Sequence, residues 1–153
     1  NKSPAEVPTK GLYSNVDLQR WAKAYGVTFQ MNPHFPINTL PLMRGAVAMQ
    51  LRGEVEFHRY LEAVFSALFE RPRNLNLPAE IGAVLIDAGL DPLEFMAQIG
   101  NQAVKDRLKQ NTTNAVSRGV FGAPTFFVGD EMYWGQDRLQ FVAEALAKSE
   151  VPG

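Results

Sequence analysis

Residues 119–139 read GVFGAPTFFVGDEMYWGQDRL, and this stretch decides the fold of the chain. Two short runs of β-forming residues, at 125–128 and 132–134, lie on either side of the turn pair GD. This arrangement is typical of a β-hairpin. Apolar residues recur at helical spacing from Asp137 onward. The stretch therefore predicts a loop, a hairpin and a closing helix.

Pro124 stands directly before the first predicted strand, where it removes a backbone N–H donor. Taken by itself, a proline in this position most often begins an edge strand. Two strands do not make a stable sheet alone. Val27–Met31 is a poor candidate for a further strand because it is short. We therefore expect the missing strands to precede Asn1, where the chain starts without a methionine.

Helical patterns fill the segment that leads to the hairpin. The capping pattern Ser14-x-x-Asp17 is expected to begin a first helix that ends at Gly26. Asp91-Pro92 offers an acidic cap followed by a proline at the first helical position. Further helices are expected in four ranges: 39–51, 57–68, 79–88 and 102–117.

Two sets of apolar side chains are expected to lie in the core. The first is a stripe at helical spacing within the second of these ranges. It consists of Phe57, Tyr60, Leu61, Val64, Phe65 and Leu68. The second set is made of flexible thioethers, which fill gaps in protein interiors. Its members are Met31, Met43, Met49 and Met96.

The amino-acid composition excludes several classes of function for this chain. A chain of 153 residues that is 46% hydrophobic fits one domain with a real core. The net charge is −1 and no basic block is present, so no nucleic-acid partner is expected. No apolar run approaches the roughly 18 residues that a membrane span needs. The absence of cysteine excludes disulfides and a cysteine nucleophile within these residues, and it fits a cytoplasmic protein.

The segment VFGAPTFFVGDEMYWGQDRL resembles the 2-hydroxychromene-2-carboxylate isomerase family and its relatives, the kappa-class glutathione transferases. NKSPAEVPTKGLYSNVDLQRWAKAYGV and FPINTLPLMRGA resemble the same family, so the resemblance covers nearly all of the chain. It implies an α/β, thioredoxin-like fold of the DsbA and kappa glutathione transferase type, with a large all-helical insertion. That family opens with a βαβ half whose serine holds the glutathione sulfur. We expect both before residue 1, so no catalytic residue is assigned in this chain.

The resemblance also implies three parts of the chain. Residues 1–30 are expected to hold the end of the N-terminal thioredoxin half and a linking helix. Residues 31–118 are expected to form the helical insertion. Residues 119–153 are expected to form the C-terminal hairpin and helix of the thioredoxin-like part.

The resemblance implies a cis peptide bond between Ala123 and Pro124. The main-chain N–H and C=O of Ala123 would then face the active site and pair with the cysteine residue of glutathione, as in strand addition. Only about 5–6% of bonds that precede proline are cis in folded proteins, so the position of the proline would not support this by itself.

A second part of the implied glutathione site is the run Trp134, Gly135, Gln136 and Asp137. Gly135 has no Cβ, so a ligand can approach its backbone closely. Free N–H groups at the start of the following helix attract a carboxylate. Asp137 is expected to accept the ammonium group of the γ-glutamyl end, although a plain helix cap is the commoner role for such an aspartate.

Lys10 and Asn1 resemble the lysine and asparagine that lie near the glycine end of glutathione in the family. A carboxylate is well matched by a cation and a neutral donor. For Lys10, a solvated loop side chain is the commoner alternative.

Phe35, Asn38 and Arg44 are candidates for the pocket of the aromatic substrate, because the family lines its pocket with this loop and the following helix. Arg44 would pair with a substrate carboxylate; a surface arginine is the alternative. His34 and His58 are far apart and have no carboxylate at ligand spacing, so no metal site is expected.

The function that the resemblance implies is a glutathione-dependent isomerase in the degradation of aromatic compounds. Its reaction interconverts 2-hydroxychromene-2-carboxylate and trans-o-hydroxybenzylidenepyruvate by reversible thiolate addition, and its relatives are homodimers. Three alternatives stay open: a kappa-like glutathione transferase, a DsbA-like disulfide oxidoreductase, and a thioredoxin-like module that only binds a partner.

Overall fold

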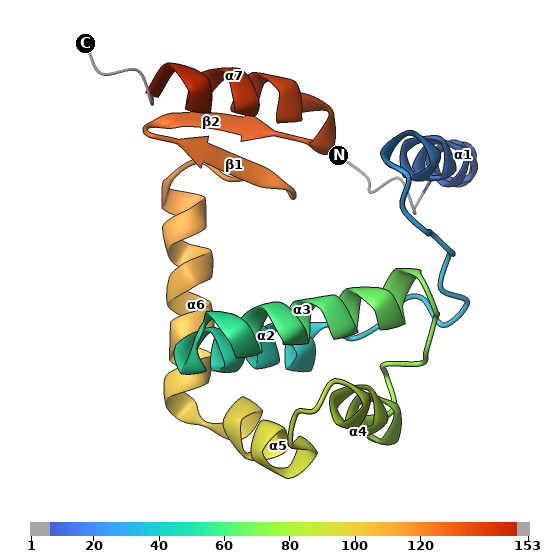
Figure 1. Cartoon of the computed structure of the whole chain (residues 1–153), viewed down its shortest axis with the longest axis vertical. Coiled ribbons are helices and arrows are strands. Elements are labelled where there is room, and N and C mark those ends of the chain that lie inside the picture. Colours follow the sequence, from blue (N-terminus) through green and yellow to red (C-terminus); the bar gives the residue numbers. More distant parts are fainter. Residues whose placement is uncertain (1–6, 150–153) are drawn as a thin grey trace. The chain divides into compact units, whose positions relative to one another are not determined.

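The computed structural model describes residues 7–149 of the chain (Figure 1). The chain divides into two compact units, residues 1–108 and 109–153. The division into 1–30, 31–118 and 119–153 stays a prediction. In the described part of the first unit all regular structure is helical, and its last helix continues into the second unit. The helices are α1 (Pro8–Tyr25), α2 (Leu40–Arg52), α3 (Glu54–Phe69), α4 (Pro78–Asp87), α5 (Pro92–Gly100) and α6 (Gln102–Ser117).

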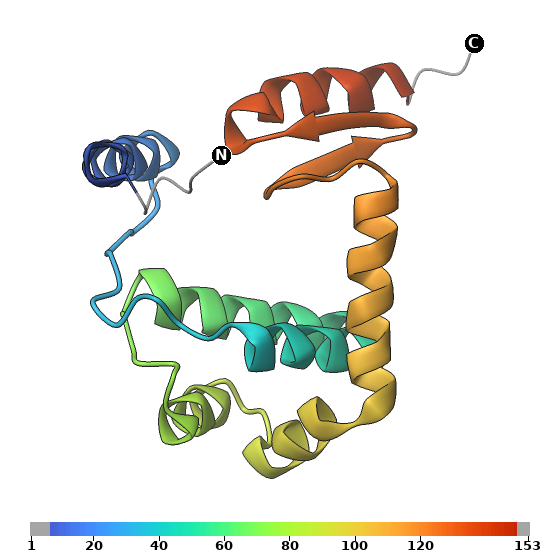
Figure 2. The ribbon, with the colours of Figure 1, turned by 180° about the vertical axis from the view of Figure 1, so that it is seen from behind.

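The core of the first unit lies between α2, α3, α4 and α5. Figures 1 and 2 show α4 and α5 on the same side of the α2–α3 pair. Phe95 is fully buried, and its ring stacks on Tyr60 with the ring centroids 5.8 Å apart. Both rings lie against Gly45, where any Cβ would collide with them. The Tyr60 hydroxyl donates to the carbonyl of Leu42 at 2.8 Å, and burial raises the pKa of this phenol.

Several helix boundaries confirm the sequence signals. Gly26 and Gly89 adopt left-handed conformations, with φ of 67° and 69°, just after α1 and α4. Pro92 is the first residue of α5. The side chain of Asp91 caps this helix, since its Oδ1 accepts from the amides of Leu93 at 2.8 Å and Glu94 at 3.3 Å.

We expect Asp91→Ala to lower the free energy of unfolding by about 1 kcal/mol, because two amides at the start of α5 lose their acceptor. Urea denaturation followed by circular dichroism measures this loss. Asp91→Asn keeps an acceptor oxygen in the same place and is expected to retain most of the stability. Equal losses for both variants would contradict the capping role.

The start of the first helix was wrongly predicted from the sequence. Helix α1 begins at Pro8, six residues before Ser14. Proline suits the first helical position because the amide that it lacks has no partner within the helix. Ser14 lies inside the helix, and its hydroxyl donates to the carbonyl of Lys10 at 2.8 Å instead of capping. Residues 27–31 form no strand, and the amide of Gln30 donates to the carbonyl of Phe69 at 2.6 Å.

The predicted core is also corrected in part. Of the apolar stripe on α3, Tyr60 and Val64 are buried, whereas Phe65 is 58% exposed. Among the four methionines, Met49 is buried and the other three are about half exposed: Met31, Met43 and Met96. Helical spacing identifies a common face, but the helices packed against that face decide how wide the buried strip is.

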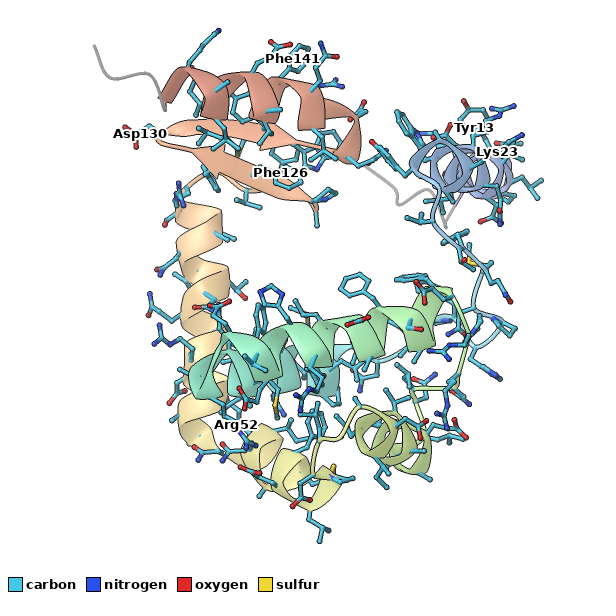
Figure 3. All side chains as sticks on the ribbon, in the orientation of Figure 1. Tyr13, Lys23, Arg52, Phe126, Asp130 and Phe141 are labelled. Atoms are coloured by element: carbon cyan, nitrogen blue, oxygen red, sulfur yellow. The ribbon has the colours of Figure 1, made fainter. Side chains whose placement is uncertain are left out.

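The second unit contains the predicted hairpin. Strand β1 (Thr125–Val128) pairs with β2 (Glu131–Trp134) in antiparallel fashion, with Thr125 opposite Trp134. Asp130 lies in the turn at the end of the hairpin, and Phe126 belongs to β1 (Figure 3). Arg118 places its guanidinium 3.4 Å from the centroid of the Phe127 ring.

The end of the hairpin departs from the sequence prediction. A 3₁₀ turn, η2 (Gln136–Arg138), comes first, and the helix α7 (Leu139–Ser149) begins two residues after Asp137. Helix α7 lies along the hairpin in both Figure 1 and Figure 2 and contacts β1 and η2. Phe141 lies on the outer face of α7 and is half exposed (Figure 3).

Candidate functional site

The candidate site is built on the segment that enters β1. The peptide bond between Ala123 and Pro124 is cis, which confirms the sequence expectation. A second cis bond, between Phe35 and Pro36, was not expected. Ala123 is exposed, and neither its N–H nor its C=O forms a hydrogen bond with another residue of the described part of the chain. Its main chain is therefore open to an extended ligand.

Two hydrogen bonds hold this segment in place. The Thr125 hydroxyl donates to the carbonyl of Gly122 at 2.6 Å. The amide of Gly135 donates to the carbonyl of Pro124 at 3.0 Å, one step beyond the last residue pair of the hairpin. The backbone on either side of Ala123 is thereby fixed, while Ala123 itself keeps a free donor and a free acceptor among the described residues.

The indole ring of Trp134 lies next to this open backbone. Its ring packs on Phe121, with the centroids 5.0 Å apart, and a Cβ on Gly122 would lie 2.6 Å from its Nε1. The lack of a side chain at residue 122 thus lets the indole lie against the main chain before Ala123. Phe121 and Gly122 were not assigned a role from the sequence, although both belong to the quoted motif. The tilted stacking of residue 121 on Trp134 is visible only in three dimensions.

The turn after Trp134 is the second part of the site. Gly135 adopts φ 104° and ψ 148°, a region that is essentially restricted to glycine. A Cβ there would lie 2.5 Å from Oδ1 of Asp137. Asp137 does not cap a helix; its Oδ2 accepts from the guanidinium of Arg138 at 2.6 Å. Arg138 thereby orients this carboxylate, and Oδ1 lies against the Gly135 backbone.

The second unit therefore brings together six of the predicted site residues: Ala123, Pro124, Trp134, Gly135, Gln136 and Asp137. Gly135 is buried, whereas Gln136 and Asp137 are exposed, so the turn is accessible at these two residues. Neighbouring backbone donors and a carboxylate at such a turn can bind a zwitterionic group.

The other predicted site residues belong to the first unit, with the exception of Asn1, which lies outside the described residues. Lys10 is exposed on α1, so its place in a loop was wrongly predicted. Phe35 is 62% exposed. Asn38 stabilises the start of α2, since its Oδ1 accepts from the amide of Leu40 at 3.2 Å. Arg44 is half-buried, and its guanidinium forms no ion pair or hydrogen bond with another described residue.

Residues 7–149 offer neither a cluster of metal ligands nor a membrane-spanning helix. No group of three potential metal ligands was found among these residues. His58 is largely exposed on α3 and pairs with Glu54 at 3.3 Å, as a histidine at a helix edge does. None of the described helices combines the length and apolar character needed to cross a membrane.

A hairpin that is preceded by proline and followed by a packed helix, in one chain with a helical unit, is typical of thioredoxin-like proteins of the DsbA type. The family model described as DSBA-like thioredoxin domain matches residues 1–147. The 2-hydroxychromene-2-carboxylate isomerase of Pseudomonas putida is 34% identical over 149 residues, which cover 95% of this chain and 70% of that protein. Glutathione S-transferase kappa 2 of Caenorhabditis elegans is 27% identical, with 95% of this chain and 70% of that protein covered.

A comparison with a solved structure supports the same family. The structure of a selenomethionine 2-hydroxychromene-2-carboxylate isomerase matches with a TM-score of 0.83 and 29% identity, covering 97% of this chain and 71% of the other. This chain belongs to the DSBA-like thioredoxin domain family and, within it, to the family of the 2-hydroxychromene-2-carboxylate isomerases.

Proposed function

We propose that the protein carrying this chain is a glutathione-dependent isomerase that interconverts 2-hydroxychromene-2-carboxylate and trans-o-hydroxybenzylidenepyruvate. The chain spans about 70% of the Pseudomonas putida isomerase, so the proposal concerns the whole natural protein. The observation that carries it is the open main chain of Ala123 next to the turn at residues 135–137, in which Gln136 and Asp137 are exposed. A tripeptide with a thiol in its centre and a zwitterion at one end matches these two features.

The chain's residues fit glutathione in two respects. The free N–H and C=O of Ala123 supply the donor and acceptor that a cysteine residue needs for antiparallel pairing. The glycine at residue 135 leaves room for the Asp137 carboxylate, because Oδ1 lies 2.5 Å from the position that a Cβ would take. In this arrangement Asp137 accepts the γ-glutamyl ammonium group through Oδ1, while Arg138 holds Oδ2.

Bound glutathione would supply a thiolate that adds reversibly to the conjugated double bond, so that rotation can occur before the thiolate leaves. The residues of this chain would position the glutathione thiolate and supply no nucleophile of their own. The chain contains no cysteine. Ala123 fixes the thiol by its backbone, and Trp134 shields one side of it. Lys10 and Asn1 are proposed to bind the glycine carboxylate.

Phe35, Asn38 and Arg44 are proposed to line the substrate pocket. Arg44 suits a substrate carboxylate because its guanidinium has no ion-pair partner among the described residues. The protein is proposed to act as a homodimer in the cytoplasm.

A kappa-class glutathione transferase is the second candidate. It is favoured by the relatives with that name, including one from Homo sapiens that is 26% identical. Such an enzyme would use the same glutathione site and release a stable conjugate. The isomerase relative has the higher identity, 34%, and its family is therefore the first choice.

An assay on the natural full-length protein tests the proposal. With 2-hydroxychromene-2-carboxylate as substrate, we expect turnover in the presence of glutathione and a loss of at least about 100-fold without it, since the thiolate is the reacting group. S-methylglutathione, which lacks the free thiol, is the matched control and is expected to inhibit without supporting turnover. Turnover that does not depend on glutathione would overturn the cofactor. Formation of a stable conjugate without isomerisation would favour the transferase.

A further inference from the structure

The first unit contains a pocket that none of the predicted site residues lines. It is formed by α3, α4 and the connection between them, and its volume is about 520 Å³. This size is within the range of small-molecule sites. Phe35, Asn38 and Arg44 are not among its lining residues, so it is separate from the proposed substrate pocket.

The α3–α4 connection is held rigidly at the rim of this pocket. The amide of Arg73 donates to the carbonyl of Ala67 at 2.8 Å, and the buried side chain of Asn32 donates to the carbonyl of Arg73 at 3.0 Å. The guanidinium of Arg73 pairs with Glu80 at 2.7 Å and with Asp87 at 3.3 Å. These contacts raise the pKa of Arg73 and join the connection to α4, so the lining is ordered before any ligand arrives.

Two further arginines of the lining have no such partners. No carboxylate of another described residue lies within ion-pair distance of Arg59 or Arg71. One amino group of the Arg71 guanidinium donates to the hydroxyl of Ser66 at 3.2 Å, which orients it along α3. Arg59 lies seven residues, about two α-helical turns, before Ser66 on the same helix. Both guanidinium groups are therefore available to an anion.

The rest of the lining selects among anions. Ala63, Val84 and Ala88 provide apolar surface for the body of a ligand. The lining holds three arginines and the two carboxylates of Glu62 and Asp87, and Arg73 is also paired with Glu80, so the positive charge open to a ligand is that of Arg59 and Arg71. A monoanion can pair with these two guanidinium groups, whereas a dianion such as phosphate is repelled more strongly by the carboxylates of Glu62 and Asp87.

We propose that this pocket binds a small organic monocarboxylate. The carboxylate group lies between Arg59 and Arg71, and the apolar body of the ligand rests on the alanine and valine side chains. The site differs from the glutathione site in residues and in chemistry, so this inference stands whether or not the isomerase proposal holds.

Calorimetric titration of the natural full-length protein with benzoate tests the inference. For a ligand of this size we expect a Kd of about 0.1–1 mM. The double variant Arg59→Gln/Arg71→Gln is expected to weaken binding by about tenfold or more, because it removes the charge-assisted hydrogen bonds. Amide NMR shifts on addition of benzoate are expected at Ser66 and Ala88.

The controls distinguish the effect of the ligand's charge from that of its shape, and binding in this pocket from binding elsewhere. Arg52→Gln makes the same change at an arginine of α2 that pairs with Glu94 and does not line the pocket, and it is expected to leave the affinity unchanged. Benzamide has the shape of benzoate without its charge and is expected to bind at least tenfold more weakly. The inference is overturned if the double variant binds benzoate normally, if benzamide binds equally well, if phosphate binds these arginines more tightly than benzoate, or if the shifts lie elsewhere.

Discussion

Replacing Phe95 with alanine is expected to lower the free energy of unfolding by about 3–5 kcal/mol, because a large cavity is left in a well-packed core. Phe95 has no exposed surface, stacks on Tyr60 and lies against Gly45. Gly45 has no side chain that could move into the space, and the Tyr60 ring is tied by its hydroxyl to the carbonyl of Leu42. The surroundings therefore cannot collapse easily.

The measurement is urea denaturation of the natural protein, followed by circular dichroism at a wavelength that reports helix. Leu93→Ala is the matched control, since Leu93 lies on the same helix and is 83% exposed. We expect this control to change the stability by no more than about 0.5 kcal/mol. Similar losses for both variants would mean that α5 does not contribute to the core as the structure shows.

The hairpin and most helix ends could be predicted from the sequence because they depend on local chemistry. The turn pair between two β-forming runs predicted β1 and β2, and the structure confirms both. Gly26 and Asp91 act through their own backbone or side chain, so their effect on a helix end can be predicted from residue type and position. The predicted helix end and the predicted helix cap are both confirmed.

The failures concern features that depend on tertiary packing or on competing local signals. Ser14 offered a capping box, but Pro8 begins the helix earlier and the serine hydroxyl bonds within it. Phe65 has the spacing of a core residue, yet no helix covers it in the described part of the first unit. Spacing alone does not reveal which neighbours an element will have.

The candidate site could be predicted only in part for a similar reason. The segment around Ala123 is continuous in sequence and carries the family resemblance, so its residues were found. The pocket that contains Arg59 and Arg71 was missed because these residues are twelve positions apart and belong to no motif. Their common feature, the lack of a carboxylate partner among the described residues, exists only in the folded chain.

Gly135→Ala is expected to weaken glutathione binding by about 10–100-fold, a range that corresponds to the loss of a hydrogen bond to a charged group. The added Cβ would lie 2.5 Å from Oδ1 of Asp137 and would also be strained at φ 104°. Either the carboxylate or the backbone of the turn must move, and both are proposed to contact the γ-glutamyl end. Asp137→Asn leaves the backbone unchanged and is expected to weaken binding by about tenfold, since only the charge is lost.

Calorimetric titration of the natural protein with glutathione measures both effects. Gly129→Ala is the matched control, because Gly129 also has a positive φ, 59°, and nothing lies within 4 Å of its Cβ position. This control is expected to reduce stability slightly and to leave the Kd for glutathione unchanged. If Gly135→Ala and Asp137→Asn both bind glutathione within twofold of the natural protein, the turn at residues 135–137 does not hold the γ-glutamyl group. If Gly129→Ala weakens binding as much as Gly135→Ala, the effect comes from a general loosening of the hairpin and not from the site.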